Sequence, residues 1–375
     1  MAKRITWVGI DDDKMNLTVA VLRGHEKEAQ IRRIPNEDRA LGRWVRRLVR
    51  EADGGEIRMC YEAGPNGFAL MRRLEAMGPV VVEVMAPSLT PRRSGQRVKT
   101  DPLDARKLVH LYQAGELRSI AVPGEDSESS RDLVRLYHRI GEEGTRKRHH
   151  ILKFLIRRGR IYRDGCHWTG KHRAWLRAQC FESWKDTETF QELLSGLAEL
   201  EGRRQRLMES LEKLAQEDAH AAQVGVLRCF LGIDTATALT LVAEIFNAER
   251  FPHPREMMSY FGLTVSVYQT ADQKTYGGIT KAGNRYGRWV LGHAAKHYRK
   301  RPSVGATLKQ RRRGQPAWAI EIADRAHQRL HRRSWALLLR GMPNGKVTMA
   351  VARELVGFVW EALVQCRRRS RTQAA

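Results

Sequence analysis

Four carboxylic acids stand where predicted strands end and where a predicted helix begins. Asp11 and Glu62 each directly follow a short apolar run that is typical of a β-strand. Asp101 and Asp104 open a predicted helix, and residues three apart on a helix share one face. Pro102 suits the first position of that helix. We expect the two strands to be neighbours, which would bring all four carboxylates together.

The chemistry that such a cluster predicts is phosphoryl transfer or hydrolysis at a nucleic-acid backbone. Carboxylates held close together repel one another, and without a cation some of them would take up protons. Magnesium removes this repulsion where phosphate groups complete its oxygen ligands, and two such ions can activate a nucleophile and stabilise the leaving oxygen. Each acid also has a purely structural explanation, since Asp101 suits a helix N-cap and Glu62 a surface loop.

The composition favours a polyanionic partner. The chain of 375 residues has 67 Lys and Arg against 42 Asp and Glu, a formal net charge of +25. Cations that bind phosphates release condensed counterions, whereas the alternative is a merely well-solvated surface. The five cysteines form no CxxC pair, which argues against a disulfide framework and a structural zinc site. No signal peptide or membrane span is recognisable, so we expect a cytoplasmic protein.

Residues 1–122 predict a mixed α/β domain. Three strands are followed by a helix, a strand, a helix, a strand and a helix. This is the element order of the RNase H-like fold, in which a hairpin sheet is extended by crossover strands. The expected strands are 5–10, 17–22, 29–34, 57–61 and 80–84, and the expected helices are 41–52, 68–77 and 101–114.

Residues 123–222 predict a helical region. They are rich in charge and poor in strand-forming residues, and leucines recur at steps of three, four or seven. An antiparallel or dimeric coiled coil would explain this spacing, and so would an ordinary helical hairpin that packs on its own domain. The recurring leucines are Leu193, Leu197, Leu200, Leu207, Leu211 and Leu214.

Residues 223–375 predict a helical C-terminal domain. A glycine turn at residues 231–234 leads into an apolar helix, as in one half of a helix-hairpin-helix, and such a turn offers N–H groups to a phosphate. Several basic or amide side chains along the chain are candidate nucleic-acid contacts, with solvated surface as the alternative. These candidates are Arg97, Lys99, Lys147, Arg148, Lys281, Asn284, Arg285 and Arg288.

Several short segments form a recognisable set of motifs. In the first region they are Val8-Gly9-Ile10-Asp11, Tyr61-Glu62-Ala63-Gly64 and Lys99-Thr100-Asp101-Pro102-Leu103-Asp104-Ala105-Arg106. In the last region they are Ala243-Glu244-Ile245, Arg250-Phe251, Tyr260-Phe261-Gly262-Leu263 and Gly278-Ile279-Thr280-Lys281-Ala282-Gly283-Asn284. With these motifs the chain resembles the DEDD transposases of insertion sequences, also called the Piv/MooV group, from about residue 5 to 365.

The resemblance implies a RuvC-like N-terminal domain whose carboxylates Asp11, Glu62, Asp101 and Asp104 bind magnesium. It also implies a C-terminal domain whose serine nucleophile attacks the DNA backbone. Members of the family resemble RNA-guided recombinases, in which a bridge RNA encoded by the element pairs with donor and target DNA. They work as homotetramers built from homodimers. The implied protein is a bacterial, nucleoid-associated transposase that binds DNA and RNA and no membrane.

One stretch departs from the family pattern. The family's serine lies in a Ser-Ser-Gly stretch, whereas this chain has Tyr268-Gln269-Thr270-Ala271. Thr270 falls at the serine position and keeps a hydroxyl, although its methyl crowds the oxygen and restricts χ1. The loss of glycine at Ala271 narrows the backbone conformations. Ser266 is the alternative nucleophile, and a third explanation is an inactive copy.

Three functions are therefore to be compared. The leading prediction is an RNA-guided transposase that cuts and joins DNA with a magnesium-bound acidic site and a Ser or Thr nucleophile. A Holliday-junction resolvase or nuclease of the RNase H-like class would need the acids but no hydroxyl near residue 270. A catalytically decayed transposase copy would bind nucleic acid without cutting it.

Overall fold

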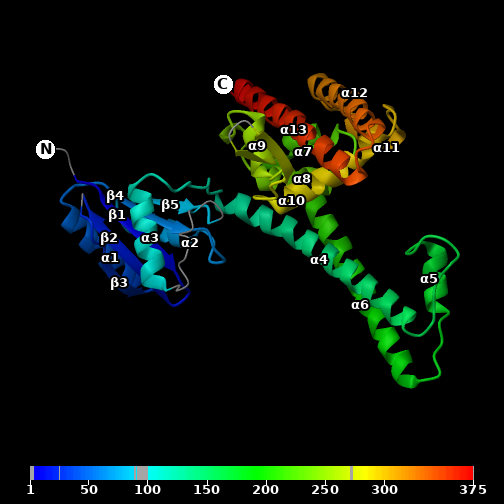
Figure 1. Ribbon diagram of the computed structural model, residues 1–375, viewed down its shortest axis with the longest axis horizontal. Coiled ribbons are helices and arrows are strands. Elements are labelled where there is room, and N and C mark those ends of the chain that lie inside the picture. The colour runs from blue at the N-terminus through cyan, green and yellow to red at the C-terminus, as the bar shows by residue number, and fades with distance from the viewer. Residues whose placement is uncertain (1–3, 25, 88–89, 91–99, 271–272, 375) are drawn as a thin grey trace. The chain divides into compact units, whose positions relative to one another are not determined.

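The computed structural model describes most of the chain, in the segments 4–24, 26–87, 90, 100–270 and 273–374. These residues form two compact units, which divide between Pro123 and Gly124 (Figure 1). Two of the predicted nucleic-acid contacts, Arg97 and Lys99, lie outside the described residues. Within the described part, none of the helices has the length and apolar character needed to cross a bilayer.

The first unit is a mixed α/β domain built on a five-stranded sheet. Its elements are β1 (Thr6–Asp12), β2 (Asn16–Arg23), β3 (Gln30–Pro35), α1 (Asp38–Ala52), β4 (Ile57–Glu62), α2 (Ala69–Met77), β5 (Val81–Met85) and α3 (Asp101–Gln113). The strand order is β3-β2-β1-β4-β5. The first three strands pair antiparallel, and β4 and β5 extend the sheet in parallel. The predicted order of strands and helices is thus confirmed.

Helices cover both faces of this sheet because both faces carry apolar side chains. α1 and α2 pack on one face, where Ile10 and Tyr61 belong to the core. α3 packs on the other face, where Cys60 and Leu108 are buried together. Since side chains alternate along a strand, the odd-numbered residues of β1 and the even-numbered residues of β4 point towards α3.

α3 runs antiparallel to β1 and lies in direct contact with it. The rings of Trp7 and Tyr112 meet edge to face, with centroids 5.1 Å apart. Two residues further along β1, a Cβ added to Gly9 would stand 2.5 Å from Val109 N and 2.6 Å from Ala105 O. Because the residue numbers of α3 fall as those of β1 rise, the first turn of α3 lies beside the carboxyl end of β1.

The second unit is mostly helical, as predicted, and carries a two-stranded sheet. Its elements are α4 (Glu125–Ile156), α5 (Gly170–Arg177), α6 (Trp184–Leu214), α7 (Asp218–Arg228), α8 (Thr235–Ile245), η1 (Ala248–Arg250), α9 (Pro254–Tyr260), β6 (Val265–Thr270), β7 (Gln273–Ile279), α10 (Arg285–Ala295), η2 (Lys296–Arg299), α11 (Ala306–Arg312), α12 (Ala317–Leu339) and α13 (Asn344–Ala374). Its main core surrounds α8, which is buried along almost its whole length, as a helix that is apolar on all sides requires.

The long helices α4 and α6 lie side by side and run antiparallel (Figure 1). Their far ends share a small core of their own with α5. In the predicted leucine series, Leu197, Leu211 and Leu214 are buried. Pairing within the chain therefore accounts for the leucine spacing. The division of this unit into a helical region and a C-terminal domain near residue 222 stays a prediction.

The predicted glycine turn before α8 is present. Gly232 has φ +77° and lies so close to α10 that an added Cβ would stand 2.8 Å from Ala294 O. Asp234 then caps α8, because its side chain accepts a hydrogen bond from Thr237 N at 2.8 Å. An N–H group that was expected to face a phosphate is bound by this carboxylate, which disfavours an anion at the same place.

The close approach at Gly9 generates a first prediction. Gly9→Ala should lower the free energy of unfolding by roughly 1–3 kcal/mol, because the new methyl group meets helix backbone that cannot move without displacing α3. Urea unfolding followed by circular dichroism measures this change. Gly64→Ala is the matched control, since its nearest neighbour would be Glu62 O at 3.8 Å. Equal unfolding midpoints for the two variants would contradict the prediction.

Candidate functional site

Asp11 and Glu62 lie next to each other at the carboxyl end of the central strands. β1 and β4 are parallel neighbours, and the residues directly before the two acids, Ile10 and Tyr61, are register partners. Those two side chains enter the core under α1 and α2. Alternation along the strands therefore places both carboxylates on the opposite face, which α3 covers.

The first turn of α3 brings Asp101 and Asp104 to the same edge. α3 passes Trp7 with Tyr112 and Gly9 with Ala105, so its next turn towards the N-terminus reaches the level of Asp11. The backbone of α3 thus leads towards the edge where Asp11 and Glu62 lie, and the meeting of the four acids stays a prediction. Among the described residues, however, no three Asp, Glu, His or Cys side chains form a group that could hold a metal ion.

The donor chemistry of this edge suits magnesium. All four predicted ligands are carboxylates, and magnesium prefers oxygen ligands of this kind. The neighbouring Asp12, which by the same alternation lies on the side of α1 and α2, has a raised pKa because its carboxyl group is buried. Its Oδ1 atom is buried and has no hydrogen-bond partner among the described residues. A divalent cation at this edge would lower the free energy of every carboxylate around it.

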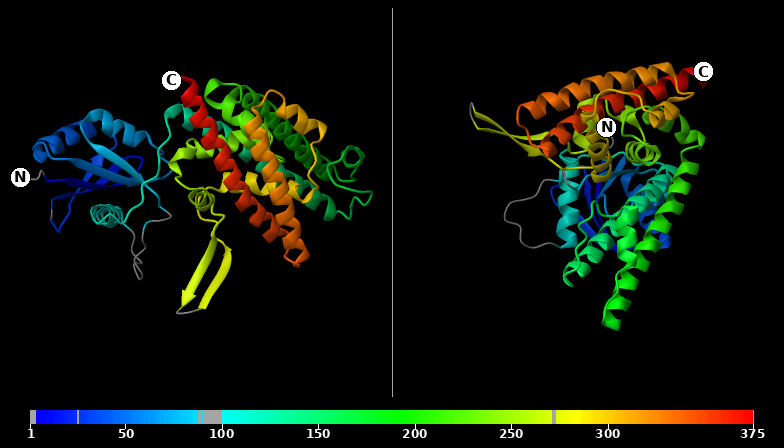
Figure 2. Two further views of the ribbon diagram at one scale, coloured as in Figure 1. Left: turned by 90° about the horizontal axis from the view of Figure 1, so that it is seen from above. Right: turned by 90° about the vertical axis from the view of Figure 1, so that its right-hand side faces the viewer.

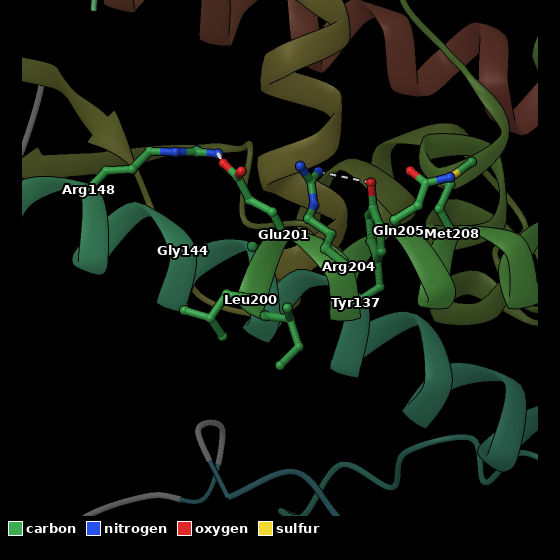
Figure 3. Close-up of a pocket in the computed structure, with 10 residues that line it drawn as sticks. Tyr137, Gly144, Arg148, Leu200, Glu201, Arg204, Gln205 and Met208 are labelled. Carbon is green, nitrogen blue, oxygen red and sulfur yellow. Dashed lines mark hydrogen bonds and ion pairs between the residues drawn. The ribbon is translucent and has the colours of Figure 1, made fainter. Parts of the chain in front are cut away.

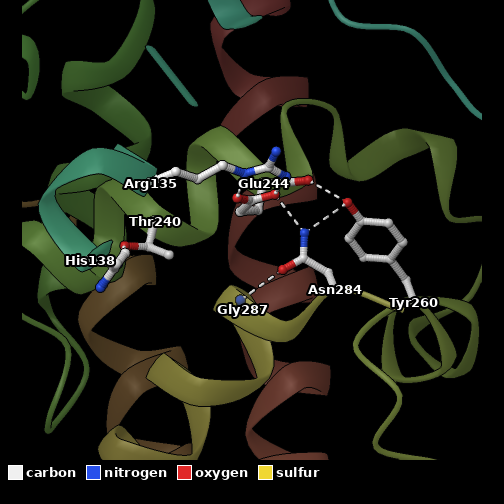
Figure 4. Close-up of polar contacts among 7 residues, drawn as sticks. All are labelled: Arg135, His138, Thr240, Glu244, Tyr260, Asn284 and Gly287. Carbon is white, nitrogen blue, oxygen red and sulfur yellow. Dashed lines mark hydrogen bonds and ion pairs between the residues drawn. The ribbon is translucent and has the colours of Figure 1, made fainter. Parts of the chain in front are cut away.

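In the second unit, a fully buried carboxylate of α8 connects α4, α9 and the start of α10 (Figure 4). Glu244 is 0% exposed. Arg135 of α4 binds it with two hydrogen bonds of 2.7 and 2.8 Å. Asn284 donates to its Oε2 atom at 2.5 Å, and Tyr260 donates to its backbone oxygen at 2.9 Å. We call these four residues the Glu244 clamp.

The Glu244 clamp fixes the segment that joins β7 to α10. The side chain of Asn284 also accepts a hydrogen bond from Gly287 N at 2.9 Å and so caps α10. Its backbone N–H donates to Tyr260 O at 2.8 Å. Gly283 has φ +102°, and an added Cβ would stand 2.2 Å from Tyr260 O, so only glycine fits there. Lys281, with φ +55°, is thereby held in the left-handed region.

The hairpin of β6 and β7 carries both candidate nucleophiles and extends away from the helices of its own unit (Figure 2). Ser266 lies at an irregularity in the pairing, where two glycines of β7 oppose it. Its Oγ atom donates to Gly278 O at 3.2 Å. Thr270 is the last residue of β6 and pairs with Gln273, whereas Ala271 lies outside the described residues. β-Bulges are common beside active sites, where they redirect a side chain.

A wide basic groove of about 1710 Å³ opens beside α10. Its walls come from α9, β7, α10, α12 and the beginning of α13. Glu354 binds two of its arginines, Arg329 and Arg333, each at 3.0 Å. Nine of the described residues that line it are lysine or arginine, namely Arg255, Lys281, Arg285, Arg288, Lys296, Arg329, Arg333, Lys346 and Arg353. Such a surface binds a polyanion by displacing its counterions.

Three of the predicted nucleic-acid contacts, Lys281, Arg285 and Arg288, line this groove. Asn284 instead belongs to the Glu244 clamp and acts on the chain itself. Three of these four residues thus lie together in the basic groove, and their contact with nucleic acid stays a prediction.

Two further predicted contacts, Lys147 and Arg148, lie between the long helices. Arg148 binds Glu201 of α6 at 2.9 Å beside a pocket of about 240 Å³ (Figure 3). A Cβ added to Gly196 of α6 would stand 3.0 Å from the Nζ atom of Lys147. Arg173 binds the same Glu201 carboxylate at 2.8 Å and holds its pKa below the usual range, with Arg148 adding to the effect. Both predicted contacts thus touch α6.

Sequence reasoning gave no role to two residues that the structure places at the centre of the Glu244 clamp, Arg135 and Glu244. Glu244 carries the only charge within the apolar run of α8, which is a signal for a buried, paired carboxylate. Its partner could not be inferred in the same way, because Arg135 lies 109 residues away among many other charged residues of α4.

Comparisons with known proteins bear on both regions. A transposase model of the DEDD type matches residues 8–157, and a model described as "Transposase IS116/IS110/IS902 family" matches residues 225–309. The chain is 35% identical to "Putative transposase y4qE" of Sinorhizobium fredii, over 97% of this chain and 90% of that protein. It is 29% identical to "Transposase for insertion sequence element IS1533" of Leptospira borgpetersenii, over 88% of this chain and 96% of that protein.

The buried charge generates a second prediction. Arg135→Leu should lower the free energy of unfolding by about 3–5 kcal/mol, because it leaves the Glu244 carboxylate buried without its cation. Glu142→Gln, on the same helix, removes the exposed ion pair with Arg285 and should cost at most about 1 kcal/mol. Urea unfolding of both variants tests this. Similar losses of unfolding free energy would show that the buried ion pair contributes no more to stability than the exposed one.

The pH dependence of folding provides a third prediction. His138 is buried, and its Nε2 donates at 2.8 Å to the hydroxyl of Thr240, which itself donates to Ala236 O at 2.6 Å. Burial, with a contribution from Arg204, lowers the pKa of His138 to about 4. The unfolded chain, with a histidine pKa near 6.5, takes up this proton first, so the contribution of His138 to stability is lost as the pH falls from 6.5 to 4.

Unfolding at pH 7 and pH 5 measures this effect. The loss of unfolding free energy between these two pH values should be smaller in His138→Gln than in the parent, by about 2 kcal/mol. His149→Gln, which replaces an exposed histidine of the same helix, should leave the parent's pH dependence in place. An unchanged pH dependence in His138→Gln would mean that His138 is not held neutral in the folded protein.

Proposed function

This chain belongs to the IS116/IS110/IS902 family of transposases, and we propose that it cuts and joins DNA strands under the direction of a guide RNA encoded by its own element. The proposed catalytic parts are a magnesium-binding acidic edge in an RNase H-like, RuvC-like first unit and a hydroxyl nucleophile in the second. The strand order of the first unit supports the RNase H-like fold. The proposed domains are 1–122, 123–222 and 223–375.

The observation that carries the proposal is the position of Asp11 and Glu62 at the carboxyl ends of neighbouring parallel strands. α3, whose first turn carries Asp101 and Asp104, runs back along β1 towards that end. When bound, magnesium would supply positive charge to stabilise the reacting phosphate. The four carboxylates would otherwise repel DNA, so their role is to bind the cation and thereby fix the position of the scissile phosphate.

The proposed nucleophile is the hydroxyl of Thr270, with Ser266 as the alternative. The hydroxyl oxygen forms a bond to phosphorus while the bond to the leaving sugar oxygen breaks, and that oxygen takes up a proton. A sugar hydroxyl of another strand later reverses the exchange and joins the DNA. Ser266 gains support from the bulge opposite it, since its bond to Gly278 O fixes the side-chain rotamer.

The proposed partners follow from charge and from the family. The net charge of +25 and the basic groove support binding of donor DNA, target DNA and a bridge RNA. Assembly of homodimers into a homotetramer rests on the family resemblance. The joining of strands requires two DNA sites to be held at once, which an assembly of several copies would provide.

A recombination assay gives the fourth prediction. Purified protein is mixed with magnesium, donor and target DNA, and RNA transcribed from the non-coding flank of the element. Asp11→Asn and Glu62→Gln should each lower strand joining by on the order of 100-fold or more, because each removes charge next to the reacting phosphate. Glu56→Gln changes an exposed carboxylate at the opposite end of β4 and should join strands like the parent.

Thr270→Ala and Ser266→Ala separate the mechanisms in the same assay. Loss of joining in one of them identifies the nucleophile and supports the transposase. Magnesium-dependent hydrolysis that persists in both variants without joining would support the resolvase or nuclease instead. A parent protein that binds RNA and DNA but leaves the strands intact would identify a decayed copy.

A further inference from the structure

One face of α10 presents a row of cations interrupted by aromatic rings. The later members of this row lie three, four, seven, eight and eleven residues after the first, a spacing that places them on one helical face. The same residues line the basic groove. In order along the helix and the 3-10 turn after it, they are Arg285, Arg288, Trp289, Gly292, His293 and Lys296.

Trp289 is unusually exposed for a residue of its size. It is 52% exposed, although a tryptophan gains more than most residues from burial. Its position is nevertheless fixed, because its ring packs at 4.4 Å from the His293 ring and at 5.2 Å, edge to face, from the His138 ring. Partial burial and the charge of Lys296 lower the pKa of His293. An indole held in place but left uncovered is suited to a flat ligand.

A second aromatic side chain enters the groove from the hairpin. Tyr276 of β7 is 65% exposed and lies among the lining residues. Cations alone would hold a duplex through its phosphates, but the bases of a duplex already stack on one another. Exposed aromatic rings inside a cationic groove are instead the combination by which proteins hold unpaired nucleotides, since every base has a face that can stack.

We propose that the basic groove holds an unpaired stretch of nucleic acid, with one base stacked on Trp289 and another on Tyr276. The inference rests on the proposed function and adds to it which form of nucleic acid this surface receives. The shared chemistry is a phosphodiester backbone with unstacked bases, and a deoxyribose or a ribose strand can supply it. Lysine and arginine side chains of the groove would neutralise the phosphates on either side of the stacked base.

The test is a binding titration of the full-length chain without magnesium, so that no strand is cut. Three labelled ligands of one mixed sequence are used: single-stranded DNA, single-stranded RNA, and the blunt DNA duplex. Trp289→Ala should weaken binding of at least one single strand by roughly 5- to 150-fold and leave duplex binding within about twofold. Trp289→Tyr should recover most of the lost affinity. The strand that shows the larger loss identifies the source as DNA or RNA.

Three further variants keep the outcome interpretable. Trp184→Ala is the matched control, because Trp184 is 73% exposed on α6 and is not among the described residues that line the groove. Tyr276→Ala, on an exposed strand, should weaken single-strand binding even if Trp289→Ala folds poorly. Lys296→Ala should weaken single strands and duplex alike. Equal losses for single strands and duplex in both aromatic variants, or no loss in either, would overturn the inference.

The same variants separate this inference from the proposed function. If the aromatic variants lose single-strand affinity while the parent fails to join strands, the groove is assigned correctly and the proposed reaction is wrong. If the parent joins strands and both aromatic variants bind single strands as the parent does, the reaction stands and the stacking assignment fails.

Discussion

The carboxylate of Glu244 has to be neutralised inside the protein, and the second unit is arranged around this requirement. An isolated charge at a position that is 0% exposed would cost several kcal/mol, so Arg135 and Asn284 must both reach it. Arg135 ties the long helix α4 to α8, and Asn284 ties α8 to the start of α10. The three elements therefore keep one relative position. The helical face that lines the basic groove begins with the residue directly after Asn284.

The first unit meets a different constraint, the contact of α3 with the sheet at Gly9. A helix that approaches β1 this closely has no freedom to slide along it, because backbone atoms of Val109 and Ala105 stand where a side chain would be. The first turn of α3 is thereby fixed beside the strand ends. Burial raises the pKa of the neighbouring Asp12, which shows that a charged carboxylate is costly in this part of the unit.

Much of the first unit could be predicted from the sequence, because its signals are local. Apolar runs that end in Asp11 and Glu62 identify two strands and the place where each one ends, and the strand ladder agrees with this. The Glu244 clamp could not be predicted, since Arg135 and Glu244 are 109 residues apart and many arginines were available. The tryptophan in the groove was also missed, because a helical spacing alone does not tell whether an aromatic residue is covered. Long-range pairing and exposure both depend on the packed structure.

The basic groove gathers nine of the cations of a chain whose formal net charge is +25. Cations on neighbouring elements repel one another, and Glu354 relieves this at one wall by binding Arg329 and Arg333. At the other wall, α10 packs closely on α13, since a Cβ on Gly292 would stand 2.8 Å from the side chain of Met349. This packing of α10 on α13 keeps the cations of the two helices close together although they repel one another. A bound polyanion removes the remaining repulsion and releases counterions, so binding strength and the rigidity of the groove should both depend on salt concentration.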